Sequence, residues 1–265
     1  MRVGLIGLGG MGKLVAEVLA GVADIEIVGA IVSKQDYDEV SKHAPAQVPL
    51  LRDIDSLLEK KPDVIAECAG HEAVREYGLK VLGSGTRLLV ISIGVLADEA
   101  LFDSLAEAAK KGRTSMVLPA GAVGGIDALR AARLSGLDEV TYRGIKPARA
   151  WLGSPAQEIV DLTELQQRQS FFSGTAREAA LAYPHNSNVA ATVALAGMGF
   201  DSTRVELIAD PGSSENIHEI EVKAASGDFF VRLAGNPLEE SPKTSALAAY
   251  SVAKCLLDLD SAVLI

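Results

Sequence analysis

The sequence predicts an α/β protein with two domains: a doubly wound parallel sheet, then an α+β domain with a mixed or antiparallel sheet. Over residues 1–119, short apolar segments alternate with segments of helical period, as in parallel α/β folds. A glycine-rich turn follows the first apolar segment. After residue 119, strands with alternating apolar and polar residues appear, which is typical of antiparallel sheets. A chain of 265 residues is long enough for both domains.

The first domain is expected to span residues 1–119. Apolar runs of the kind buried in parallel sheets predict strands at 3–6, 25–32, 64–68, 87–91 and 116–119. Apolar residues at helical spacing predict the intervening helices, at 11–19, 53–59, 72–82 and 98–111.

The second domain is expected to span residues 120–239 and to carry catalysis, substrate binding and dimerisation. It opens with a small-residue hinge, and short helices are expected in the polar stretch 151–169. Further helices are predicted at 126–134 and 189–196, and strands at 140–146, 205–209, 218–224 and 229–233. The last two strands read as a hairpin with one apolar face. An apolar helix at 245–259 is expected to return to the first domain, so that residues 240–265 complete it.

Composition excludes several classes of protein. The formal net charge of −10, with no basic run, argues against a nucleic-acid partner. No segment is long and apolar enough to span a membrane, and the apolar run 3–7 is too short for a signal peptide. The two cysteines are far apart and no metal-ligand spacing is present. We therefore expect a cytoplasmic protein without a metal.

The glycine-rich turn predicts a dinucleotide site. Residues 7–12 read Gly-Leu-Gly-Gly-Met-Gly, which fits G-x-G-x-x-G between a strand and a helix. Gly7 permits the tight turn, Gly9 lets the backbone approach the pyrophosphate, and Gly12 lets helix and strand pack closely. Gly10 and Met11 open the helix whose N–H groups face the phosphates. The first domain is thus predicted to be of the Rossmann type, with NAD or NADP as cofactor.

The end of the second strand leaves the choice of cofactor open. An NAD site usually has an acidic residue here, but this chain has Ser33 followed by Lys34. We expect no carboxylate to repel a 2′-phosphate; Lys34 would either attract that phosphate or simply be solvated. Cys68 and Ala69 are also expected to line the cofactor site, because they end the strand at 64–68.

Candidates for chemistry come from several short segments. His218 shares the apolar face of its strand and is a candidate acid/base group, although such a histidine is more often a hydrogen-bonded core residue. His71 is a weaker candidate. Asn188 either caps the helix that follows or contacts the nicotinamide or the substrate. Lys243 and Thr244 precede the last helix and either cap it or bind a carboxylate.

The chain resembles the L-aspartate dehydrogenase family. The resemblance runs almost end to end and rests on the glycine turn together with the following segments: 67–70, 92–94, 119–125, 184–190, 216–218, 236–237 and 243–245. It implies oxidation of L-aspartate to iminoaspartate with NAD or NADP. The imine then hydrolyses to oxaloacetate and ammonia, or feeds NAD biosynthesis. It also implies cofactor contacts at Ala122 and Asn188, an active-site histidine at His218, and a homodimer.

Two alternatives remain beside this interpretation. One is another two-domain NAD(P) reductase, of the dihydrodipicolinate reductase or homoserine dehydrogenase type. The first of these is expected to carry a paired-histidine motif in its second domain, whereas His218 stands alone, with no second histidine beside it. The other is a non-catalytic dinucleotide sensor, which would need no acid/base residue.

Overall fold

The chain folds into two compact units. A computed structural model describes residues 1–238 and 241–263, with the side chains of all of these except 241–243. The first unit comprises Met1–Pro119 and Ala248–Ile265, and the second comprises Ala120–Leu247. The second boundary thus falls eight residues beyond the one predicted at 239/240.

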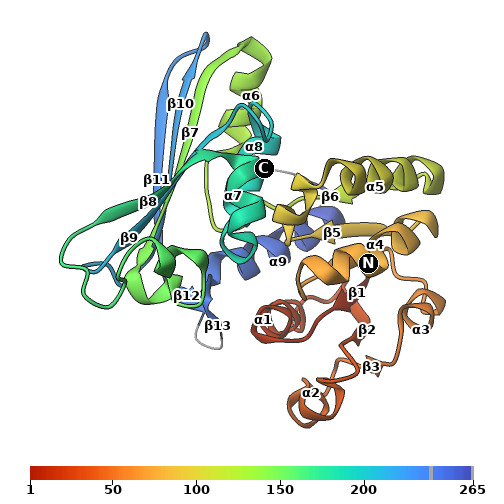
Figure 1. Ribbon diagram of the computed structural model, residues 1–265. Helices are drawn as coiled ribbons and strands as arrows, with labels where there is room; N and C mark the ends of the chain where they lie inside the picture. The colour runs from red at the N-terminus through yellow and green to blue at the C-terminus, as the bar shows by residue number, and fades with distance from the viewer. Residues whose placement is uncertain (239–240, 264–265) are drawn as a thin grey trace. The chain divides into compact units, whose positions relative to one another are not determined.

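The first unit is built on a six-stranded, wholly parallel sheet in the order β3-β2-β1-β4-β5-β6 (Figure 1). Its strands are β1 (Arg2–Ile6), β2 (Glu26–Ile31), β3 (Leu50–Leu51), β4 (Val64–Glu67), β5 (Arg87–Val90) and β6 (Met116–Val117). The connecting helices are α1 (Gly10–Leu19), α2 (Tyr37–His43), α3 (Ile54–Glu59), α4 (His71–Gly83), a 3₁₀ turn (Ile93–Ala97) and α5 (Glu99–Gly112).

The core of this unit explains its apolar strands. The β1 residues Val3 and Leu5 are fully buried, because helices cover both faces of a parallel sheet. The last helix, α9 (Ala246–Asp260), packs into the same core through Ala249, Val252 and Leu256. Residues from opposite ends of the chain therefore form one apolar cluster.

The second unit is built on a mixed five-stranded sheet in the order β11-β10-β7-β9-β8. Only β7 and β9 run parallel; the other neighbouring pairs are antiparallel. The strands are β7 (Leu137–Pro147), β8 (Gln169–Thr175), β9 (Arg204–Asp210), β10 (Asn216–Ala224) and β11 (Phe229–Gly235). A small ladder joins β12 (Pro237–Leu238) to β13 (Ser241–Ser245). The predicted fold class is confirmed.

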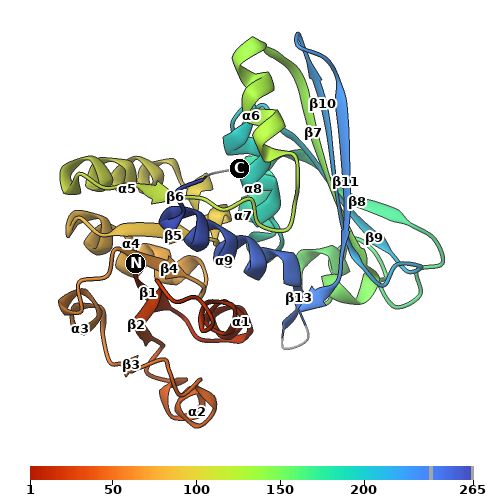
Figure 2. The ribbon, with the colours of Figure 1, turned by 180° about the vertical axis from the view of Figure 1, so that it is seen from behind.

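Helices of the second unit cover one face of this sheet (Figure 2). They are α6 (Ile126–Ser135), α7 (Ala176–Ala182) and α8 (Asn188–Ala196), with 3₁₀ turns at Ala148–Trp151, Pro155–Glu158 and Pro184–Asn186. Tyr142 and His218 project from the buried face, whereas Arg143 and Glu221 belong to the opposite face.

Sequence patterns missed several short elements: α2, β3, β8, α7 and the β12–β13 ladder. A usable signal was present for α7. The Thr175 hydroxyl accepts a hydrogen bond from the Glu178 N–H, and the Glu178 carboxylate accepts one from the Thr175 N–H. This capping box reads as T-x-x-E in the sequence.

Candidate active site

The glycine turn joins β1 to α1 and is shaped by close packing. Gly7 has φ +91°, and a Cβ placed there would lie 2.8 Å from the Ala69 Cβ. A Cβ on Gly12 would overlap the Gly7 carbonyl oxygen. Gly7 and Gly12 are therefore required by the protein's own packing.

Gly9 differs, because a Cβ there would meet no protein atom within 4 Å. It occupies the N-cap position of α1, where no side chain caps the helix and the first turn has no acidic residue. Such a helix end offers N–H groups and a partial positive charge to an anion. The open space at Gly9 and the uncapped helix fit a dinucleotide pyrophosphate, with Gly10 and Met11 in the first turn.

The end of β2 corrects one expectation. The sequence suggested that no carboxylate lies near Ser33, but the Ser33 hydroxyl donates a hydrogen bond to the Asp36 carboxylate at 2.6 Å. The Asp36 N–H also donates to the Ser33 hydroxyl, at 3.1 Å. This turn places a carboxylate three residues beyond the usual position. Ser33, Lys34 and Asp36 are all exposed.

A buried carboxylate braces the neighbouring loop. Glu67 ends β4 with no solvent exposure and accepts hydrogen bonds from the N–H groups of Ala69 (2.8 Å), Gly70 (2.6 Å) and Ser92 (3.1 Å). The Ser92 hydroxyl donates a fourth bond, at 3.0 Å. Burial raises the pKa of Glu67, and these four hydrogen bonds oppose that rise. Ala69, whose N–H bonds Glu67, packs against Gly7, so Glu67 supports the glycine turn through Ala69. Sequence patterns gave Glu67 no role.

Cys68 and Ala69, both predicted to line the cofactor site, lie in this braced loop. The Cys68 N–H donates to the Ile6 carbonyl at 2.7 Å. Burial, and secondarily the Glu67 charge, raises the pKa of the Cys68 thiol above its ordinary value. The Cys68 thiol is therefore neutral and is no nucleophile.

In the second unit, His218 and Tyr142 form a buried pair. His218 lies on β10, directly opposite Gly144 of β7. The Tyr142 hydroxyl oxygen is 2.8 Å from His218 Nδ1, and the other ring nitrogen, Nε2, is buried without a partner among the described residues. Burial, and secondarily the Lys146 charge, lowers the pKa of His218 to about 3. The imidazole is therefore neutral at neutral pH.

Lys146 is a candidate site residue that sequence patterns missed. It alternates along β7 with Tyr142 and Gly144 and so belongs to the same face. Its ammonium donates to Asn186 Oδ1 at 3.1 Å and lies 5.4 Å from the centre of the Trp151 ring. The bond to Asn186 joins the segment 184–189 to the face of the sheet that carries His218. In the sequence, the available signal was a lysine at a core-facing position of a strand.

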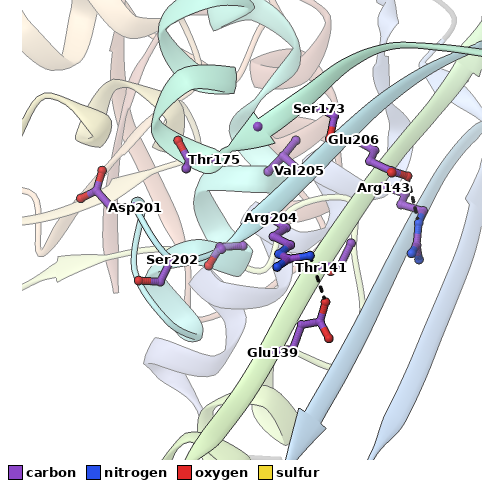
Figure 3. A pocket seen from close by; sticks show the side chains of 12 residues that line it. Glu139, Thr141, Arg143, Ser173, Thr175, Asp201, Ser202, Arg204, Val205 and Glu206 are labelled. Atoms are coloured by element: carbon purple, nitrogen blue, oxygen red, sulfur yellow. Dashed lines mark hydrogen bonds and ion pairs between the residues drawn. The ribbon is translucent and has the colours of Figure 1, made fainter.

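A hollow on the opposite face of the same sheet is a separate feature (Figure 3). Its arginines already hold carboxylates: Arg143 bonds Glu206 at 3.1 Å, and Arg204 lies 3.6 Å from Glu139. Residues on this face point away from His218, because neighbours along a strand alternate. We therefore do not place the substrate in it.

Comparison with known proteins agrees with this division. Residues 7–119 match the family model "Homoserine dehydrogenase, NAD binding domain". Residues 127–259 match the model "Aspartate dehydrogenase, C-terminal". An L-aspartate dehydrogenase of Cupriavidus taiwanensis is 44% identical over 97% of this chain and 96% of its own length.

The chain belongs to the aspartate dehydrogenase family.

Two further relatives support this assignment. An L-aspartate dehydrogenase of Pseudomonas aeruginosa is 43% identical over 97% of this chain and 96% of its own length. The crystal structure of aspartate dehydrogenase from Thermotoga maritima has a TM-score of 0.77 at 28% identity, covering 100% of this chain and 99% of that one. The first domain model bears a homoserine dehydrogenase name, so it is the second unit that separates the aspartate dehydrogenase family from the rival reductases.

The remaining positions expected from the aspartate dehydrogenase family lie in the second unit. Ala122 is buried in the turn before α6. Asn188 is the first residue of α8 and half-buried, with Ser187 in the N-cap position that was one option for Asn188. Thr244 is half-buried in β13, next to Ser245, whose hydroxyl accepts a bond from the Asn216 amide at the start of β10. The side chain of Lys243 lies outside the described residues.

Proposed function

We propose that this chain oxidises L-aspartate to iminoaspartate with NAD or NADP, and that the imine hydrolyses to oxaloacetate and ammonia or feeds NAD biosynthesis. The similarity to named L-aspartate dehydrogenases over 97% of the chain carries this proposal. The bound nicotinamide would accept a hydride at C4 from the substrate C2, and the reaction can run in either direction.

The first unit supplies the cofactor site. The α1 N–H groups around Gly9, Gly10 and Met11 would bind the pyrophosphate, and the family resemblance makes Ala122 and Asn188 further candidates for cofactor contacts. We further propose that NAD is preferred. The Asp36 carboxylate would accept hydrogen bonds from ribose hydroxyls and repel a 2′-phosphate. Asp36→Asn should then lower the ratio of the Kd for NADP to the Kd for NAD.

The second unit supplies the substrate site. His218 is the acid/base group: its buried Nε2 would exchange a proton with the substrate amine or with the water that attacks the imine. The two substrate carboxylates need donors. Asn188, Thr244 and Lys243 are candidates by type, and Lys146 adds a buried cation on the His218 face.

A substrate screen tests the activity. Reduction of NAD and NADP is measured with L-aspartate, L-glutamate, L-homoserine and L-alanine, and turnover with L-aspartate alone is expected. If none of the four amino acids led to cofactor reduction, the result would favour the dinucleotide sensor.

His218→Ala tests the proposed role of the histidine. Turnover should fall by about 100-fold or more, because general acid–base catalysis contributes about that much. The Kd for the dinucleotide should stay nearly unchanged, since the glycine turn is untouched. Equal losses of turnover and dinucleotide affinity would contradict the assignment.

We also propose a homodimer in the cytoplasm, with the dimer contact in residues 120–239. The family resemblance supports the dimer, and light scattering during gel filtration measures the mass. Both cysteines are free, which suits a reducing compartment. No helix in the described part of the chain is long and apolar enough to cross a membrane.

A further inference from the structure

Tyr142 reaches His218 across a gap that a glycine leaves open. Gly144 lies directly opposite His218, and a Cβ there would lie 2.8 Å from the Tyr142 hydroxyl oxygen. The two rings are nearly parallel, with an angle of 18° and centroids 6.0 Å apart. Tyr142 is fully buried and His218 is 3% exposed, so water does not compete for the bond between them.

The direction of this hydrogen bond decides which nitrogen of His218 carries the proton. Burial raises the pKa of Tyr142, so the phenol keeps its proton, and lowers the pKa of His218, so the imidazole is neutral. A neutral imidazole has one N–H donor and one acceptor nitrogen. Either the hydroxyl donates to Nδ1 and Nε2 is protonated, or Nδ1–H donates to the hydroxyl and Nε2 is bare.

Counting buried groups separates the two cases. If the hydroxyl donates, only Nε2–H lacks a partner among the described residues. If Nδ1 donates, the phenol proton and the Nε2 lone pair both lack one, since His218 is the hydrogen-bond partner that the described structure gives Tyr142. Each unsatisfied buried polar group destabilises the fold, so the first arrangement is favoured.

We propose that Tyr142 is a positioning residue that donates to His218 Nδ1 and so keeps the proton on Nε2. His218 then meets its ligand first as a hydrogen-bond donor to an oxygen. Taking the proposed function as its basis, that oxygen belongs to a substrate carboxylate, next to the charge of Lys146. Nε2 can accept a proton only in the other tautomer, in which Nδ1 carries the proton and donates to the Tyr142 hydroxyl oxygen.

Nitrogen NMR on the full-length protein labelled with ¹⁵N-histidine, without cofactor or substrate, tests the tautomer directly. The chain has four histidines, and His218→Gln assigns the resonance in question. We expect a protonated Nε2 and an unprotonated Nδ1 for His218. A protonated Nδ1 in the wild-type protein would overturn the proposal, whether or not the enzyme oxidises aspartate.

Tyr142→Phe tests the positioning role. The His218 tautomers should become mixed, and KM for L-aspartate should rise by a larger factor than kcat falls. Tyr183→Phe is the matched control, because it also removes the hydroxyl of a buried tyrosine in the same unit, whose ring contacts are with Trp151, Phe171 and Phe172. It should leave the tautomer unchanged.

A second variant keeps the hydroxyl but displaces it. Gly144→Ala adds the methyl group that would crowd the Tyr142 oxygen and should also mix the tautomers. An unchanged His218 tautomer in both variants would show that Tyr142 does not set it. The wild-type spectrum remains decisive if neither variant folds.

Discussion

The glycines of the cofactor turn show how different reasons select the same residue. Gly7 and Gly12 are required by contacts inside the protein, whereas Gly9 faces open space. The sequence motif treats the three positions alike. Only the structure separates glycines that the fold needs from the one that a ligand would need.

Gly9→Ala should therefore leave folding intact and weaken NAD binding, because its methyl group would occupy the space assigned to the pyrophosphate. Its backbone, at φ −76° and ψ −166°, suits alanine. Gly12→Ala should instead lower Tm, since its methyl group would overlap the Gly7 carbonyl oxygen. Thermal unfolding and NAD titration measure both variants. A loss of Tm in Gly9→Ala as large as in Gly12→Ala would contradict this division.

Ser33 marks the limit of residue-level prediction. The dinucleotide-binding motif specifies an acidic residue at one position at the end of β2, and that position holds the hydroxyl of Ser33. A turn of three residues brings the Asp36 carboxylate to the same hydroxyl. Local geometry therefore supplies a carboxylate that position-by-position comparison does not include.

At the scale of elements, strand and helix positions followed well from apolar periodicity. Short or polar elements such as β8 and α7 were not predicted, because so few residues do not show whether the apolar pattern repeats with the helix period or the strand period. The contacts that hold the connecting loops were also not predicted. Glu67 looks like one polar residue in an apolar strand, yet its carboxylate joins the β4–α4 loop to the segment after β5.

Glu67→Gln should destabilise the first unit by about 1–3 kcal/mol, because the amide NH₂ would face backbone N–H donors. Dinucleotide affinity should fall with it, since Ala69 supports Gly7. Urea unfolding and NAD titration provide the measurements. Glu72→Gln is the control: the Glu72 side chain is 92% exposed, so near-wild-type stability and dinucleotide affinity are expected there. Matching losses in the two variants would show that the buried bonds are not responsible.

At the scale of the whole molecule, the buried neutral His218 makes stability depend on pH. Its pKa is about 3 in the folded chain and near its ordinary value of 6.5 when unfolded. Between these values the unfolded chain binds the extra proton, so stability is lost as the pH falls below about 6.5. Among the described residues, Tyr142 bonds His218 without charging it, and the Lys146 charge favours its neutral form.

Acidification from about pH 7 to about pH 5 should remove about 2 kcal/mol more stability from the wild-type protein than from His218→Gln. Urea unfolding at each pH gives the difference. Glu67 has a raised pKa and acts with the opposite sign, because its contribution is lost as pH rises. It is present in both proteins and cancels in the comparison. Equal pH dependence in the two proteins would rule out the buried neutral histidine.

The sequence by itself determined the two fold types, the glycine turn and the family, because each depends on patterns within a few neighbouring residues or on their order along the chain. Tertiary structure alone decided how the site residues are paired. Tyr142 and His218 are 76 residues apart, and Lys146 and Asn186 are 40 apart. Strand register and chain reversal bring them together, and neither is encoded locally. The chemical state of His218 follows from that pairing and from burial.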